Sequence, residues 1–162
     1  MTDDRIKFDL TAEFVTAHTL PTLTELAYGF DHGWLRESEV VGIAEHELAS
    51  GVALAPSGEE LALLLRDDYT RVADVLSNVE ADGGQAWRLW LYLALAWLSE
   101  NRDQFEDPYE AIESLYADFG YPDEIAGLVR FMPARAGEAS GLGAIDRRWA
   151  AYLEERARTY DQ

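Results

Sequence analysis

The sequence predicts an all-α fold, a compact single-domain bundle of seven or eight helices around a central Trp-rich helix. Apolar residues recur at helical spacing along most of the 162 residues, and capping patterns precede several of these segments. No segment has the alternation of a strand, apart from a weak Ile6–Phe8 pair. Because a chain of this length buries roughly 70% of its unfolded surface, one domain over residues 1–162 is expected.

Helix-start and helix-stop signals divide the first third of the chain into three short helices. The first begins after Thr11, a residue type that caps helices through its hydroxyl. The second begins with a capping box of Thr22 and Glu25. The third covers 37–50 and is predicted to end at Gly51, which is suited to a left-handed backbone conformation.

A second capping box, of Ser57 and Glu60, predicts the start of the next helix. The helical period continues to Leu76, with a break expected at Asp67–Asp68. A clear breaker, 82–84, then separates this part from the Trp-rich segment.

The Trp-rich segment predicts a helix over about 85–101 with apolar residues most of the way round. Such a helix must be covered on most sides, so it is expected at the centre of the bundle. The apolar run 89–98 is well short of the roughly 20 residues needed to cross a bilayer. Three tryptophans are expected to anchor the core: Trp87, Trp90 and Trp97.

The strongest helix start is Asp107-Pro108, which supplies an N-cap and a proline at the first helical position. Glu110 completes the capping box, and the helix is expected to end near Gly120. Another helix should start at Pro122-Asp123 and run to Met132-Pro133. After it, a loop over 134–143 and a last amphipathic helix over about 142–160 are expected.

The formal net charge is −18, from 31 acidic and 13 basic residues. Residues 1–133 contain 26 acids and 8 bases, and residues 134–162 contain 5 of each. This charge disfavours binding to nucleic acid or to an anionic membrane and favours a basic protein partner. The alternative is a solvated surface that only keeps the protein soluble. Four arginines of the last helix could meet the acidic body: Arg147, Arg148, Arg156 and Arg158.

The absence of cysteine suits a reducing compartment, and the N-terminal residues lack the apolar segment of a secretory signal, so a cytoplasmic location is expected. His46-Glu47 matches the start of the zinc motif H-E-x-x-H, but Ser50 stands where the second histidine should be. No nucleotide-binding loop or nucleophile elbow is present. No catalytic residue, metal site or cofactor is therefore predicted.

Four residues within the 107–133 segment are candidates for a binding site: Tyr116, Asp118, Tyr121 and Arg130. Tyrosine and arginine dominate binding hot spots, and Asp118 lies beside the corner at Gly120. The structural alternatives are a capping role for Asp118 and an ion pair of Arg130 with Asp118 or Glu124.

Several short motifs occur along most of the chain: Tyr28-Gly29, Gly33-Trp34, 97–102, Asp107-Pro108, 116–119, Tyr121-Pro122, Val129-Arg130 and Met132-Pro133. In these residues the sequence resembles the uncharacterised bacterial family known as domain of unknown function 2247. Departures from its pattern are small: Tyr109 stands where an aliphatic residue is more usual, and Phe131 where tyrosine is expected. The resemblance implies a small, soluble, helical bacterial protein, and it carries over no catalytic residue. Some relatives resemble immunity proteins of interbacterial toxin systems.

Two functional hypotheses follow. The leading one is a non-enzymatic interaction protein, most concretely an immunity protein that blocks a basic toxin. The alternative is a small ligand-binding domain or enzyme with a site around Asp118, Tyr121 and Arg130, which would require these side chains to converge on a cleft. A structural or regulatory subunit is a third hypothesis, and the oligomeric state stays open.

Overall fold

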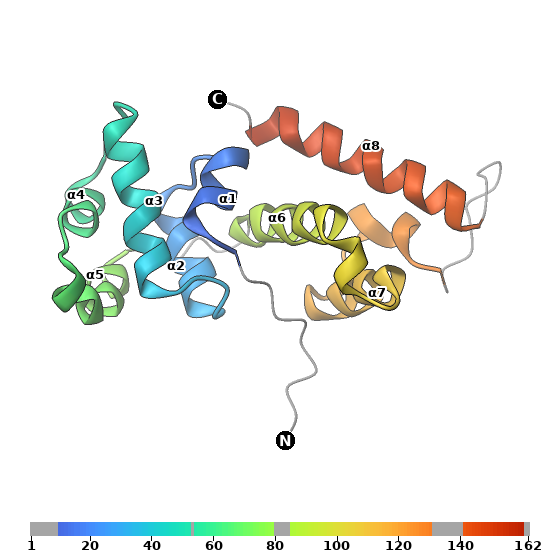
Figure 1. The fold of residues 1–162 in the computed structure, drawn as a ribbon, viewed down its shortest axis with the longest axis horizontal. Helices are drawn as coiled ribbons and strands as arrows, with labels where there is room; N and C mark the ends of the chain where they lie inside the picture. Colours follow the sequence, from blue (N-terminus) through green and yellow to red (C-terminus); the bar gives the residue numbers. More distant parts are fainter. Residues whose placement is uncertain (1–9, 53, 80–84, 131–140, 161–162) are drawn as a thin grey trace, which may run out of the picture. The chain divides into compact units, whose positions relative to one another are not determined.

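A computed structural model describes residues 10–52, 54–79, 85–130 and 141–160. These residues form eight α-helices and three 3₁₀-helices, and none of them lies in a strand (Figure 1). The all-α prediction is confirmed. The Ile6–Phe8 pair and most of the predicted 134–143 loop lie outside the described residues.

The chain divides into two compact units, Phe8–Trp90 with Tyr160–Gln162, and Leu91–Thr159 with Met1–Lys7. They are called the first and second unit below. The expectation of a single domain stays a prediction.

The first unit contains α1 to α5 and the start of α6. The three predicted N-terminal helices are confirmed, with side-chain caps at Thr11 and in the Thr22–Glu25 capping box. The bounds are α1 Ala12–His18, α2 Leu23–Asp31, α3 Glu37–Ala49, α4 Pro56–Ala62, η1 Arg66–Arg71 and α5 Val72–Ser77.

The second unit contains most of α6 and the elements after it. The predicted Trp-rich helix and the last helix are both confirmed as helices, the latter with the predicted ends. The bounds are α6 Ala86–Glu100, η2 Arg102–Gln104, α7 Pro108–Asp118, η3 Asp123–Leu128 and α8 Leu142–Tyr160.

The predicted capping box of Ser57 and Glu60 is wrong. The helix begins two residues earlier, with Pro56 as its first residue and Ala55, in place of Ser57, as an N-cap without a side-chain hydrogen bond. Proline at this position already has a helical φ and lacks only an N–H that would be unpaired there. The break also comes earlier than expected, because α4 ends at Ala62 and Arg66–Arg71 is a 3₁₀-helix.

The second half of the 107–133 segment also differs from the prediction. In place of an α-helix running to Met132, the structure has the six-residue 3₁₀-helix η3. The chain is already extended at Val129, with φ −104° and ψ 124°. Met132 lies outside the described residues.

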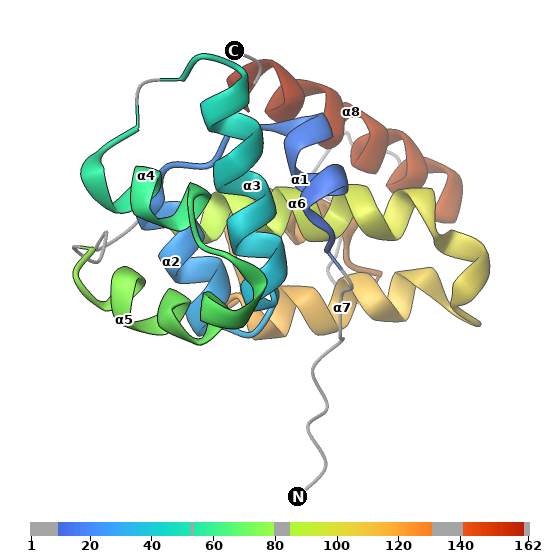
Figure 2. The same cartoon turned by 60° about the vertical axis from the view of Figure 1, so that its left-hand side comes forward.

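The helix α3 is the packing centre of the first unit. It contacts α1, α2, α4, η1 and α5, and Figure 2 shows it among these helices. Its N-terminal half is also tied to α1, where the backbone N–H of Ala12 donates to the Glu39 carboxylate. One face of α3 is buried: Val40, Val41, Ile43, Ala44 and Glu47.

The helix α6 is buried on nearly all sides between Ala86 and Leu98. Its predicted position at the centre of the bundle stays a prediction. Among its tryptophans only Trp90 is fully buried, at 1% exposure, whereas Trp87 and Trp97 are partly exposed. Trp149 of α8, which was not among the predicted core tryptophans, is buried completely. Among the described residues, every helix is too short or too polar to span a membrane.

The Trp90 ring lies directly over Gly29 of α2. Its indole Nε1 donates to the Glu25 carbonyl at 2.9 Å, and its ring stacks on Trp34 at a centroid distance of 5.9 Å. A Cβ at position 29 would overlap ring atoms of Trp90. The absence of a side chain at Gly29 therefore sets how closely these segments of the first unit pack.

Replacing Gly29 by alanine should destabilise the protein by about 2 kcal/mol, because the ring must move from a position fixed by its hydrogen bond. Urea unfolding measures this change. Gly143→Ala is the control, since its new Cβ would be 3.7 Å from its nearest neighbour, the Arg147 guanidinium, and alanine favours a helix. Equal stability of the Gly29 variant and wild type would show that the contact is not a constraint.

Candidate functional site

The four predicted binding residues lie in the second unit, in α7 and the segment after it. Tyr116 is buried, at 5% exposure, and Tyr121 is 62% exposed. Asp118 is the last residue of α7 and is exposed, as is Arg130. The four residues therefore differ widely in accessibility.

The two tyrosines belong to a Schellman turn that ends α7. The Tyr121 N–H donates to the Tyr116 carbonyl at 2.7 Å, and the Gly120 N–H donates to the Ala117 carbonyl at 3.1 Å. The Tyr116 and Tyr121 rings pack edge to face at 5.3 Å, which is the apolar contact that accompanies such turns. Gly120 has φ +77° and Tyr121 has φ +60°, so two successive residues are left-handed. The conformation is unfavourable for a tyrosine.

Arg130 is held by two carboxylates of the α7 region. Its guanidinium makes two hydrogen bonds to Glu113, of 2.9 and 3.2 Å, and an ion pair of 3.0 Å with Asp107. The Glu113 hydrogen bond is the main cause that raises the pKa of Arg130. The predicted pairing with Asp118 or Glu124 is wrong.

Glu124 instead pairs with Arg156 of α8 at 2.8 Å. Arg148, also in α8, donates to the Gly127 carbonyl at 2.7 Å. Of the four arginines expected to meet the acidic body, Arg156 does so through Glu124. The hydrogen bond of Arg148 is with a backbone carbonyl of η3, and Arg158 pairs with Glu154 within α8.

A second polar cluster continues from Arg130. The Arg130 guanidinium lies 5.9 Å from the centre of the Tyr109 ring, and the Tyr109 hydroxyl donates to Asp146 at 2.8 Å. Asp146 also pairs with Arg102 at 3.1 Å, and that guanidinium lies 4.1 Å from the Trp149 ring. Sequence reasoning missed Asp146, because a lone acid in an amphipathic helix gives no signal of its partners.

Each unit has a hollow among its described residues, and that of the second unit is about 320 Å³. Its lining contains acidic groups and no cation: Gln104, Phe105, Glu106, Asp107, Glu110, Ala111 and Ser114. None of the four predicted binding residues lines it.

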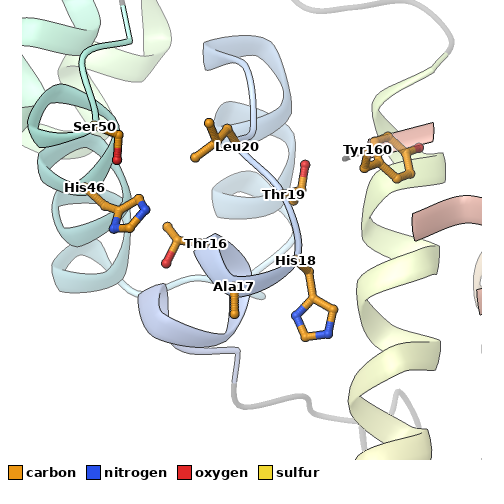
Figure 3. A pocket seen from close by; sticks show the side chains of 8 residues that line it. All are labelled: Thr16, Ala17, His18, Thr19, Leu20, His46, Ser50 and Tyr160. Carbon is orange, nitrogen blue, oxygen red and sulfur yellow. The ribbon is translucent and has the colours of Figure 1, made fainter. Parts of the chain in front are cut away.

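The hollow of the first unit is about 240 Å³, and its lining side chains are shown in Figure 3. Nδ1 of His18 lies 2.9 Å from the Phe14 carbonyl. His46 and Ser50, one helical turn apart, both line it, but no hydrogen bond joins their side chains among the described residues. The remaining lining residues are Thr16, Ala17, Thr19, Leu20 and Tyr160.

In the described part of the chain, no serine that lines either hollow is hydrogen-bonded to a histidine side chain. A Ser–His nucleophile requires a hydrogen bond between the two side chains. A metal site is also missing there, since no group of three or more His, Asp or Glu could hold an ion.

Glu47 is the least expected ionisable group of the first unit. It is 4% exposed, and its Oε1 has no hydrogen-bond partner among the described residues. Burial raises its pKa to about 7, and the charge of Glu25 contributes in the same direction. Its side chain follows the buried stripe of α3, so the sequence pattern alone marks it as an acid on an apolar face.

Glu47 should make the protein less stable as the pH rises from 4.5 to about 7. In this range the folded state keeps a proton that the unfolded state has lost, so raising the pH favours unfolding. Glu47→Gln should remove this loss and be more stable than wild type at about pH 8, by up to about 3 kcal/mol. Urea unfolding at several pH values measures the difference.

Glu45→Gln is the matched control for Glu47, because Glu45 is an exposed acid of the same helix. Both substitutions remove one negative charge, so their difference isolates the effect of burial. Parallel pH profiles for the two variants would contradict a raised pKa at Glu47.

Replacing Tyr109 by phenylalanine should cost about 1 kcal/mol, since the hydrogen bond to Asp146 is lost while the ring stays. Tyr121→Phe, which removes an exposed hydroxyl of the same unit, should change stability by less than about 0.5 kcal/mol. Thermal unfolding distinguishes the two. A larger loss of stability for Tyr121→Phe than for Tyr109→Phe would mean that the Tyr109–Asp146 hydrogen bond does not stabilise the second unit.

The comparisons with known proteins identify a family for this chain. No curated protein and no solved structure matches the chain. A family model described as an uncharacterized protein conserved in bacteria, DUF2247, matches residues 12–157. The matched range includes α1 to α7 and most of α8. The chain therefore belongs to the DUF2247 family.

Proposed function

We propose that this chain is a non-enzymatic interaction protein that binds a basic protein, most concretely an immunity protein that neutralises an interbacterial toxin. The proposal includes a cytoplasmic location, which the absence of cysteine favours. Its main support is the distribution of charge between the two units.

The first unit contains 16 acidic and 4 basic residues, and the second contains 15 and 9. Most of the net charge of −18 therefore belongs to the first unit. Several of its acids are exposed and form no ion pair with another described residue: Glu13, Asp31, Glu45, Glu59, Asp67, Asp68 and Asp74. Acids that are not neutralised within their own chain can attract a basic partner and speed association.

The alternative site around Asp118, Tyr121 and Arg130 has less support. A functional cation would need to be available to a ligand, yet Arg130 is already bound by Glu113 and Asp107. The residues named for this site line neither the hollow of the first unit nor that of the second. A ligand-binding or enzymatic function would require rearrangement of these contacts.

The toxin candidates are the secreted toxin domains encoded beside the gene. One of them should bind the purified chain, and co-expression should protect cells from it. Because the attraction is electrostatic, the dissociation constant should increase at least about tenfold between about 50 and about 300 mM salt. Isothermal titration calorimetry and growth assays measure these effects. No binding and no protection for any neighbouring toxin would exclude the immunity function.

Two matched variants test whether the first unit supplies the attraction. Neutralising Glu59, Asp67 and Asp68 to the amides should lower the association rate about tenfold. The control neutralises three exposed acids of the second unit: Asp103, Glu106 and Glu155. Both triple variants change the net charge equally, so an equal effect would show that only total charge matters.

A further inference from the structure

Two leucines of the first unit are exposed to an unusual degree. Leu63 is 71% exposed and Leu65 is 72% exposed, whereas Leu64 between them is 7% exposed. Both follow α4, in the short connection to η1. Leu64 anchors this connection in the core and leaves its two neighbours facing outward.

The helical geometry places acids on the same surface as these leucines. Leu63 closes the last turn of α4, where its N–H donates to the carbonyls of Glu59 and Glu60. Residues three and four positions apart lie on one helix face, so both carboxylates flank Leu63. The Asp68 N–H donates to the Leu65 carbonyl at 2.8 Å. Leu65 is the N-cap residue of η1, and this backbone hydrogen bond keeps Asp68 within one turn of it.

The segment 59–68 thus combines an apolar centre with a negative rim. It contains four acids and one base, Arg66, and Glu60 is paired with Arg71 from the next turn. Exposed apolar side chains surrounded by polar ones mark an interaction surface. The negative rim opposes a second copy of this chain and an anionic lipid surface, because both would bring like charge.

We propose that Leu63 and Leu65 form the apolar centre of the surface on which the basic protein partner docks. This inference rests on the proposed function and specifies its binding surface. The partner has an apolar depression bordered by lysine or arginine, so that the leucines enter the depression while the basic groups meet Glu59, Asp67 and Asp68. The charges steer the encounter, and the leucines slow dissociation.

Two synthetic peptides of equal length and charge separate these contributions. One is an amphipathic helix of lysine and leucine, and the other is the same peptide with every leucine replaced by serine. The wild-type chain should bind the leucine peptide at least about tenfold more tightly, since burial of a leucine side chain accounts for such a factor. Leu63→Ser combined with Leu65→Ser should reduce this preference to about twofold or less and leave the affinity for the serine peptide unchanged.

Leu142→Ser is the control, because Leu142 is an exposed leucine of the second unit, at 47% exposure. Thermal unfolding should be unchanged in all variants, since each removes an exposed side chain. Light scattering tests self-association through the same leucines, and a dimer lost in the double variant would overturn the proposal. With the cognate toxin domain, the double variant should dissociate at least about tenfold faster, and Leu142→Ser should not.

The outcomes distinguish this inference from the proposed function. If both peptides bind with equal affinity and the leucine substitutions have no effect, the docking surface is wrong while attraction to basic partners stands. If neither peptide binds at low salt, the basic-partner function fails and this surface with it.

Discussion

The burial of one face of α3 is the interaction on which the first unit depends. This helix contacts α1, α2, α4, η1 and α5, so those elements share one packing partner. Its apolar stripe ends in Glu47, an acid without a hydrogen-bond partner on the buried Oε1 among the described residues. A buried carboxylate without a partner costs free energy, and the raised pKa is the measure of that cost. The expected consequence of this burial is a stability that depends on pH.

The ends of three helices show what the sequence could predict. Helices α2, α3 and α7 each end in a Schellman turn with a left-handed glycine, at Gly33, Gly51 and Gly120. A glycine after a periodic apolar stretch is a local signal, so these ends were predictable. The same turn explains four residues of the family pattern, Tyr28-Gly29 and Gly33-Trp34. They lie in the last turn of α2 and in the Schellman turn that ends it, and Gly29 also leaves room for the Trp90 ring.

What the sequence could not predict depends on distant partners. The Arg130 pairing with Glu113 and Asp107 joins residues 17 and 23 positions apart, and no local rule selects these acids over Asp118 or Glu124. The early end of α4 also depends on tertiary packing. Apolar residues continue through Leu65, but the sequence does not show that Leu64 is buried while Leu63 and Leu65 are exposed. Likewise, an α-helix over this segment was predicted from Ile125, Leu128, Val129 and Met132. The burial of the first three is equally compatible with a 3₁₀-helix followed by an extended residue.

The distinctive residues of the 107–133 segment have structural roles in the fold. Asp107 caps α7 and binds Arg130 at once, and Tyr121 completes the turn that ends the same helix. Residues with such duties are constrained by the fold, so their distinctive pattern identifies a family without locating a function. The side chains of Leu63 and Leu65 differ from these residues, because the described structure leaves both largely exposed. Covering an exposed leucine side chain removes apolar surface from water, which is favourable. The exposed leucines and the surrounding acids of the first unit thus have more freedom to serve binding than the conspicuous corner of the second.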